Sequence, residues 1–495
     1  MEKEQSQNNY SHILKYTGIF GGVQGLNILI ALVRNKFVAL ILGPYGMGLL
    51  SLFNSTIHFL SDSTNLGLGM SAVKNISVAY AQHDEESLRR SIKVVRSWSL
   101  LTAVFGMLLC VVLAPLLSQW TFGWGNHALH FALLSPVVGM TAITGGELAI
   151  MKGTRELGNL ARQALFSIVA ALFISIPIYY IWGEEAIVPS IVLMGLSQMI
   201  ITISYSFRSY PPHFSLRGST LRQGMGMVKL GTAFLFAGMF GSGSEFVVKS
   251  FLNNAGSQVI LGLYNAGYMM AFTYAGMVFS AMETDYFPRL SSVPTVGTQL
   301  NDVVNKQIEV SLLLLSPLLA CFIIGLPIII PLLYSSDFLP VMGMSQLTVL
   351  AMYLRAVKLP VAYLPLARGD SHIYLLMETL YDFVFAALSI VCFLKFGLVG
   401  MGIAILGAAV FDFFLLIFYM RYRYHYVLSR GVQVIFLKQA PIGVAVYAVT
   451  FLHNAWAYWI AGLLLCALSV YISITILHSK THLWEHLTKR FRRQA

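Results

Sequence analysis

The residues of this sequence that could do chemistry are charged side chains inside long apolar segments. Arg355 and Lys358 stand three residues apart in YLRAVKLPVAYLP, so they share one face of a helix. Pro360 and Pro365 follow them and can break that helix. A charge in the middle of a membrane helix costs about 2.5–3.5 kcal/mol and requires a partner or a cavity. We expect both cations to line a cavity, with pairing to an acid of the next segment as the alternative.

Acidic residues form two further pairs at helical spacing. Glu245 and Lys249 are four residues apart with the acid first, the favourable order for an ion pair. The pair is either structural, or it is a gate or substrate contact near the outer end. The preceding run 241–244 (GSGS) is a predicted bend or hinge. Glu378 and Asp382 have the same spacing but cannot neutralise each other. They are predicted to couple transport to an ion, or else to pair with the cations of the preceding segment.

Lone charges occur in other apolar runs. Arg34 lies about two turns before a Gly-Pro break, and arginine can bind phosphate oxygens through two N–H groups at once. The alternative is that Arg34 and Lys36 extend to the outer head groups. Asp62 lies in the polar patch 61–65 (SDSTN), which a lipid-facing surface would not tolerate, so we expect it to line the cavity. Glu147 and Asp412 have no evident partner in the sequence.

The composition places these charges in a membrane protein. Hydrophobic residues make up 57% of the 495 residues and charged residues 11%, with a mean hydropathy of +0.72. Soluble domains carry about 25% charged residues, so lipid must cover this surface. The four cysteines lie inside apolar runs and are read as buried free thiols. No CxxC, HExxH or GxxxxGK[ST] motif is present, so no metal, cofactor or ATP-driven step is expected.

The apolar residues form long, continuous segments. In hydrocarbon only helices and closed barrels satisfy the backbone, and barrel strands would be shorter and would alternate. The predicted fold class is therefore an all-α polytopic membrane protein with about 14 transmembrane helices. The predicted segments are 13–42, 47–70, 94–117, 129–151, 161–182, 187–207, 225–253, 259–286, 307–334, 341–366, 372–394, 398–420, 434–453 and 455–477.

Lysine and arginine gather on alternate connections and at the C-terminal end. If the N-terminus is cytoplasmic, most of the 32 cations lie inside, which predicts cytoplasmic termini and an even number of crossings. Lys74, Arg89 and Arg90 would lie at the inner mouth, where they either attract an anionic head group or only set the topology. Arg96 counts among the same inward cations. The net charge of +11 is thus no argument for nucleic-acid binding.

A short turn pattern occurs twice. Gly43–Gly46 (GPYG) predicts a tight hairpin at the outer surface, and Phe251–Met270 repeats the order of apolar run, small-residue turn and re-entry. The recurrence predicts two pseudo-symmetric six-helix lobes around a central cavity. The predicted divisions are 1–207 (first lobe), 208–224 (cytoplasmic connector), 225–430 (second lobe), 431–478 (two added helices) and 479–495 (basic cytoplasmic tail).

Four motifs carry a family resemblance. They are LGPYGMG (42–48), GLGMSAV (67–73), GLYNAGY (262–268) and FPRLSSV (287–293). With them the chain resembles the polysaccharide transport family, which includes the O-antigen translocases (Wzx type), within the multidrug/oligosaccharidyl-lipid/polysaccharide exporter (MOP) superfamily.

The resemblance implies a flippase and not an enzyme. Its substrate would be an undecaprenyl-diphosphate-linked oligosaccharide. Alternating access, driven by an ion gradient or the membrane potential, would move it from the inner to the outer leaflet of the bacterial inner membrane. Arg34 matches a cavity-facing arginine common in the superfamily. The implied partners are this glycan, membrane lipid, and the polysaccharide polymerase and chain-length machinery, with the protein acting as a monomer.

Other functions remain open at this stage. A lipid II flippase shares the expected fold and the diphosphate head group, and no residue excludes it. A cation-coupled drug exporter is less favoured, because the membrane cations are about as numerous as the acids. A polymerase or glycosyltransferase would need a sizeable outer loop, which the segment spacing does not provide.

Overall fold

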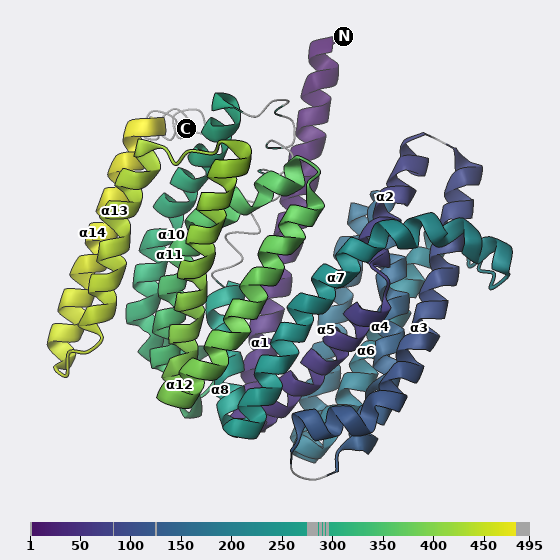
Figure 1. Cartoon of the computed structure of the whole chain (residues 1–495), viewed down its shortest axis with the longest axis horizontal. Coiled ribbons are helices and arrows are strands. Elements are labelled where there is room, and N and C mark those ends of the chain that lie inside the picture. Colours follow the sequence, from purple (N-terminus) through teal and green to yellow (C-terminus); the bar gives the residue numbers. More distant parts are fainter. Residues whose placement is uncertain are drawn as a thin grey trace, which may run out of the picture. The chain divides into compact units, whose positions relative to one another are not determined.

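The structure is a computed structural model that describes residues 2–82, 84–123, 126–274, 286, 290, 293 and 297–481. This part of the chain is almost entirely helical and contains no strand (Figure 1). Its helices are α1 (Glu2–Thr64), α2 (Leu68–Ala81), α3 (Glu85–Thr121), α4 (Ala128–Gly153), α5 (Leu157–Trp182), η1 (Gly183–Ala186), α6 (Ile187–Ser209), α7 (Gly218–Ala255), α8 (Gln258–Met269), η2 (Met270–Tyr274), α10 (Thr298–Leu333), η3 (Ser336–Val341), α11 (Met342–Ala367), α12 (Ser371–Tyr424), α13 (Arg430–Val449) and α14 (Ala455–Thr481).

The helices have the length and composition of membrane spans. Within the described residues, nine helical stretches are long and apolar enough to cross a bilayer. Two of them, Leu157–Ser209 and His372–Tyr424, contain 53 residues each. A straight helix of that length would measure about 80 Å, against a hydrocarbon core of about 30 Å. The first is interrupted by η1 and the second by Gly397, whose φ is +59°, so each is long enough to hold two spans.

The predicted fold class is confirmed, because each predicted apolar segment falls on a helix of the described chain or on its described part. Several boundaries were wrong. The first two segments fall mainly on the two halves of α1, which meet at Gly43, and α2 is a separate helix of which the segment 47–70 covers only the beginning, residues 68–70. α3 and α10 begin earlier than predicted, at Glu85 and Thr298, because polar turns extend these helices beyond the apolar run. Most of the FPRLSSV motif and the tail beyond Thr481 lie outside the described residues.

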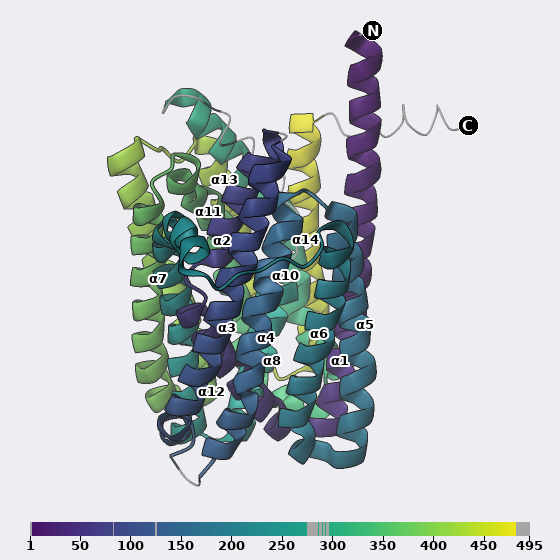
Figure 2. The same cartoon turned by 90° about the vertical axis from the view of Figure 1, so that its right-hand side faces the viewer.

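The chain divides into two compact units, Met1–Gly262 with Leu333–Ser335, and the remainder. In the first unit α3, α4, α6 and α5 pack in that order, as Figure 2 shows, and α1 packs on both α5 and α7. α7, predicted to belong to the second lobe, packs on α1, α2 and α3 in this first unit. In the second unit α11 packs along α12 and α13 packs along α14.

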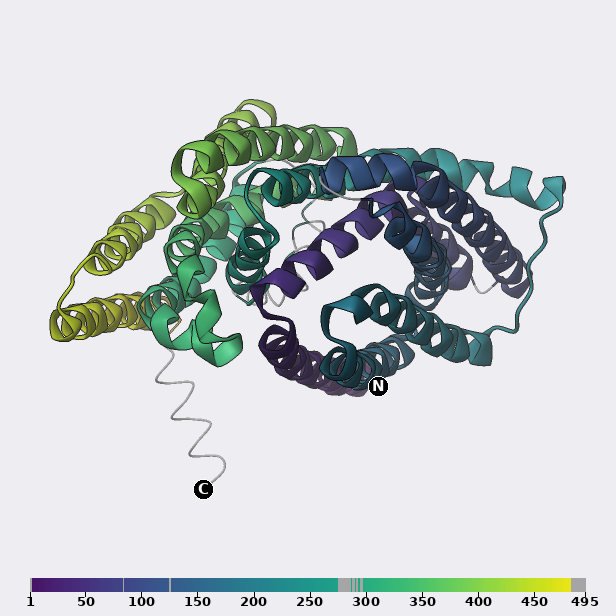
Figure 3. The same ribbon diagram turned by 90° about the horizontal axis from the view of Figure 1, so that it is seen from below.

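The two turn motifs meet in the first unit. Gly43 has φ +60° and ψ −170°, which interrupts α1. In Figure 3 the purple ribbon of α1 changes direction along its length. A Cβ on Gly48 would lie 2.1 Å from the carbonyl oxygen of Gln258, and a Cβ on Gly262 would lie 1.8 Å from that of Pro44. The glycines of the repeated pattern therefore allow the backbones of α1 and α8 to touch.

Replacing Gly48 or Gly262 by alanine is expected to lower the free energy of unfolding by about 1–3 kcal/mol or more. The reason is that the new methyl group meets backbone, which cannot rotate away. The control is Gly69→Ala on α2, where a Cβ meets nothing within 4 Å and stability should stay equal or rise slightly. Thermal unfolding of the purified variants in detergent measures the difference. Equal melting of all three variants would contradict the close approach.

A second backbone crossing joins the end of α1 to α7. Leu66 and Gly67 both have positive φ, and the Asn65 side-chain oxygen accepts a hydrogen bond from the N–H of Gly67 at 2.8 Å. A Cβ on Gly231 of α7 would lie 2.3 Å from the Leu66 carbonyl oxygen. α7 bends by 67° between Lys229 and Phe234. α7 is helical through the run 241–244, so the bend predicted there lies instead at this crossing.

Candidate functional site

The second unit holds a charged cavity between α11 and α12, which we call the α11–α12 cavity. Its volume is about 210 Å³. Its walls combine cations, acids, tyrosines and apolar side chains, namely Phe272, Ala351, Met352, Arg355, Lys358, Leu359, Tyr363, Tyr374, Glu378, Tyr381, Ile405, Ala409 and Asp412. The predicted pair Arg355 and Lys358 thus shares one cavity, as the helical spacing indicated.

Lys358 is the centre of an ion-pair network in this cavity. Its ammonium pairs with the Asp412 carboxylate and lies 3.9 Å from the nearer oxygen of Glu378. It also lies 4.8 Å from the centre of the Tyr381 ring. The side chains of Lys358 and Asp412 are only 15% and 3% exposed. The reading of Asp412 as a lone acid was wrong, because its partner is 54 residues away in the sequence.

Arg355 occupies a different part of the cavity wall. Its guanidinium carbon lies 5.1 Å from the centre of the Phe272 ring, within range of a cation–π contact. α11 continues through Pro360 and Pro365 to Ala367, so the predicted break of this helix was wrong. Asp382 is half-buried on α12, one turn after Glu378, and is not a wall residue of the cavity.

In the first unit, Arg34 is directed toward neighbouring helices. Its Nε donates a hydrogen bond to the Ser175 hydroxyl of α5 at 3.0 Å, and its terminal nitrogen lies 3.2 Å from the sulfur of Met194 on α6. Lys36 bonds to the carbonyl oxygen of Tyr334. Both side chains therefore contact other parts of the protein. The alternative prediction, that they extend to the outer head groups, did not include these contacts.

Three further predicted residues of the first unit, Glu245, Lys249 and Asp62, lie where α1 meets α7. Lys249 and Glu245 form the expected ion pair at 2.6 Å, with Lys249 8% and Glu245 47% exposed. Phe59 and Phe246 stack with ring centres 5.3 Å apart and hold the two helices together. Asp62 packs beside Gly238 of α7, near the end of α1 at Thr64, whereas the predicted segment 47–70 placed it well inside a helix.

Sequence reasoning missed a buried ion pair in the first unit. Arg96 of α3 binds both carboxylate oxygens of Glu147 on α4, at 2.8 and 3.1 Å, and both side chains are 5% exposed. Arg96 also donates to the carbonyl oxygens of Tyr210 and Pro211, at 2.9 and 2.7 Å. Ser206 of α6 donates to Glu147 at 2.5 Å. Arg96 is therefore not an exposed cation that only sets the topology, and Glu147 is not a lone acid. The two residues are 51 positions apart, so no local spacing in the sequence indicated that they form a pair.

The predicted inner-mouth cations are exposed and partly engaged. Arg89 lies 3.5 Å from Glu85 and Arg90 lies 2.9 Å from Glu86, each one helical turn away on α3. Such exposed pairs contribute little to stability. Lys74 is exposed on α2.

Comparisons with known proteins give the family. A model of polysaccharide biosynthesis proteins matches residues 37–343, well over half of the chain. The chain belongs to this family. No curated protein matches it by sequence. The resemblance to the polysaccharide transport family, which the turn motifs indicated, is therefore confirmed at the level of the family.

Solved structures show the fold. A structure of the lipid II flippase MurJ, in an inward closed conformation, aligns with 93% of this chain and 99% of its own at 13% identity and a TM-score of 0.73. An inward-facing multidrug resistance transporter of the MATE family aligns with 83% and 95% at 12% identity, with a TM-score of 0.64. A MOP superfamily transporter from Pyrococcus furiosus aligns with 82% and 93%, at 12% identity and a TM-score of 0.56. The chain is a multi-pass membrane protein with the MOP fold.

Proposed function

We propose that this protein is a flippase that moves an undecaprenyl-diphosphate-linked oligosaccharide from the inner to the outer leaflet of the bacterial inner membrane by alternating access. Membership of the polysaccharide biosynthesis family and the MOP fold support a transport role in glycan assembly. The observation that carries the proposal is the α11–α12 cavity, where α11, a helix long and apolar enough to span a membrane, presents two cations. A diphosphate is the part of such a substrate that needs cations in the membrane.

The network around Lys358 suggests how binding and an ion gradient are coupled. Asp412 and Glu378 compete with an incoming anion for the Lys358 ammonium. Protonation of these acids, or a bound cation, would release Lys358 to the diphosphate. Arg355, held against the Phe272 ring, supplies the second positive charge. In this proposal Asp412 joins Glu378 in the coupling role, and Asp382 acts from the next helical turn.

The other proposed contacts are in the first unit. Arg34 is proposed to bind the diphosphate, while Asp62, Glu245 and Lys249 are proposed to contact substrate or act as a gate where α1 meets α7. Lys74, Arg89 and Arg90 are proposed to attract the anionic head group at the inner mouth. Action as a monomer and contacts with the polymerase and chain-length machinery belong to the same proposal.

Loss of the protein should make a lipid-linked glycan accumulate. Cells lacking it are compared with cells complemented by wild type, Arg34→Ala or Arg355→Ala at matched membrane abundance. Wild type should clear the accumulated glycan and both variants should clear it more slowly. Lys395→Ala, an exposed cation of α12, is the control and should behave as wild type. Accumulation of lipid II instead would favour a lipid II flippase, and no accumulation with unchanged surface glycan would refute both.

A further inference from the structure

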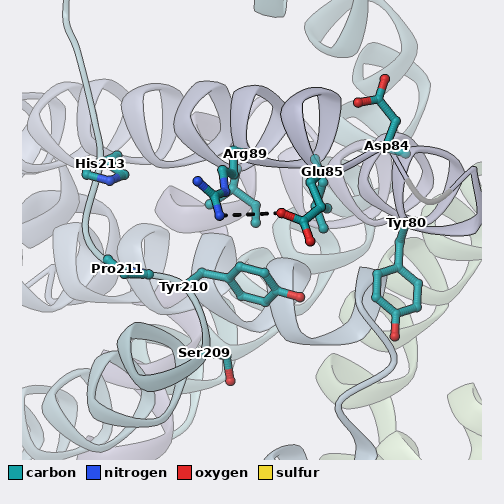
Figure 4. Close-up of a pocket in the computed structure, with 11 residues that line it drawn as sticks. Tyr80, Asp84, Glu85, Arg89, Ser209, Tyr210, Pro211 and His213 are labelled. Carbon is teal, nitrogen blue, oxygen red and sulfur yellow. Dashed lines mark hydrogen bonds and ion pairs between the residues drawn. The ribbon is translucent and has the colours of Figure 1, made fainter.

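A second, larger cavity lies in the first unit, away from the membrane charges described above. It has a volume of about 550 Å³, in the usual range for small-ligand pockets. It lies where α2 ends, α3 begins and the loop 210–217 leaves α6. Its walls are Ala79, Tyr80, Asp84, Glu85, Leu88, Arg89, Ile92, Ser209, Tyr210, Pro211 and His213 (Figure 4). We call it the loop pocket.

The loop pocket has a rigid frame. Leu88 and Ile92 belong to a buried apolar cluster that joins α2, α3, α4 and α7. The opposite wall is fixed by Arg96, which holds the carbonyl oxygens of Tyr210 and Pro211. Further along the loop, the N–H of Ser215 donates to the Ser97 hydroxyl of α3 at 2.9 Å. The pocket is therefore built by tertiary contacts and not by the chance position of a free loop.

The side chains at its rim suit a neutral, hydroxyl-rich ligand. Glu85 and Arg89 form an ion pair at 3.5 Å that is 84% and 77% exposed, so both keep polar atoms open to a ligand. Tyr210 points toward them across the pocket, and Tyr80 lies at its other end (Figure 4). Burial raises the pKa of the Tyr210 phenol, which stays neutral and can donate a hydrogen bond.

The charges argue against an anion. Two acids, Glu85 and Asp84, which caps α3 by accepting from the N–H of Ser87, stand against one cationic wall residue, Arg89, so the wall has no excess of positive charge. The attraction proposed for Lys74, Arg89 and Arg90 acts on the head group at the membrane surface and not inside the pocket. Carboxylate and guanidinium groups can hold neighbouring hydroxyls through charge-assisted hydrogen bonds, and tyrosine rings offer apolar faces to sugar C–H groups.

We propose that the loop pocket binds sugar residues of the transported glycan, while the diphosphate is bound elsewhere. This inference rests on the proposed function, and on the charge pattern that predicts this end of the first unit to be cytoplasmic. The pocket then takes the glycan on the side where the lipid-linked repeat unit is made. Because Tyr210 and Pro211 are held by Arg96, an occupied pocket is linked directly to α3 and α4.

The test is sugar binding by the purified full-length protein in lipid nanodiscs. Saturation-transfer NMR is recorded with glucose, galactose, mannose, rhamnose, N-acetylglucosamine and N-acetylgalactosamine in turn. At least one sugar should receive saturation, and Tyr210→Ala or Glu85→Gln should raise its Kd about tenfold or more. Tyr210→Ala leaves the backbone carbonyl that Arg96 holds.

The matched control is Glu86→Gln, which changes the adjacent and equally exposed acid of the same helix but no wall residue. It should bind the sugar as wild type does, and pyrophosphate should not displace the sugar. Absence of saturation for all six sugars, equal binding by Tyr210→Ala, or displacement by pyrophosphate overturns the sugar site.

The two proposals can fail separately. If the protein binds none of the six sugars but wild type still clears a lipid-linked glycan from cells, the loop pocket alone is overturned. Specific sugar binding in a protein whose loss accumulates no lipid-linked glycan supports the pocket and overturns the proposed function.

Discussion

Replacing Lys358 by methionine is expected to abolish transport and to lower the free energy of unfolding by about 3–5 kcal/mol. The reason is that Asp412, which is 3% exposed, would lose the ammonium that faces it, so its carboxylate would stay buried without that cation or have to take up a proton. Melting temperature in detergent and glycan clearance in complemented cells measure the two effects. Lys395→Met, at an exposed position of α12, should leave both at wild-type values.

A double variant separates stability from function. Lys358→Met combined with Asp412→Asn removes both charges, so folded abundance should recover toward wild type while transport stays lost. If the single variant melts and transports as wild type does, the ion-pair network has no role in either.

Replacing Arg96 by methionine is expected to be as damaging to the fold, again by about 3–5 kcal/mol, because it leaves the Glu147 carboxylate buried without its cation. Two loop carbonyls lose their donor as well. Arg96→Lys should recover only part of the lost stability, because an ammonium lacks the planar fork of N–H donors with which the guanidinium reaches both carboxylate oxygens and both carbonyls. Thermal unfolding and sensitivity of the loop 210–217 to protease report the effect.

The double variant Arg96→Met with Glu147→Met is the control for a lost charge pair. Apolar side chains of similar size can replace a buried ion pair without loss of stability. Recovery of the melting temperature in the double variant is therefore expected. A double variant that is no more stable than Arg96→Met would show that the loop carbonyls, and not the charge pair, dominate.

What the sequence predicted correctly depends on local pattern. Apolar run length gave the helices, since a lipid environment leaves the backbone few alternatives. The pair Glu245–Lys249 was predictable because its two members are one helical turn apart. Arg355 and Lys358 face one cavity for the same reason.

What the sequence could not show depends on contacts between distant segments. Lys358 with Asp412, and Arg96 with Glu147, join helices that no local spacing relates. The bend of α7 lies where its backbone crosses Gly67, so a composition rule for hinges placed it wrongly in the Gly-Ser run. The loop pocket likewise depends on contacts such as those of Arg96, which hold a loop that is remote from α3 in the sequence.

The most direct test of the central claim is movement of the substrate across a bilayer. Undecaprenyl-diphosphate-linked glycan, purified from cells lacking the protein, is incorporated with wild-type protein, with Lys358→Met or with no protein into sealed liposomes. A membrane-impermeant glycosidase is then added outside the liposomes, and the fraction of glycan that it cleaves is measured over time. The flippase proposal predicts that wild-type protein lets the enzyme reach the internal half of the glycan, whereas the variant and the empty liposomes leave it protected. Equal protection in all three preparations, with an ion gradient imposed in either direction, would contradict it.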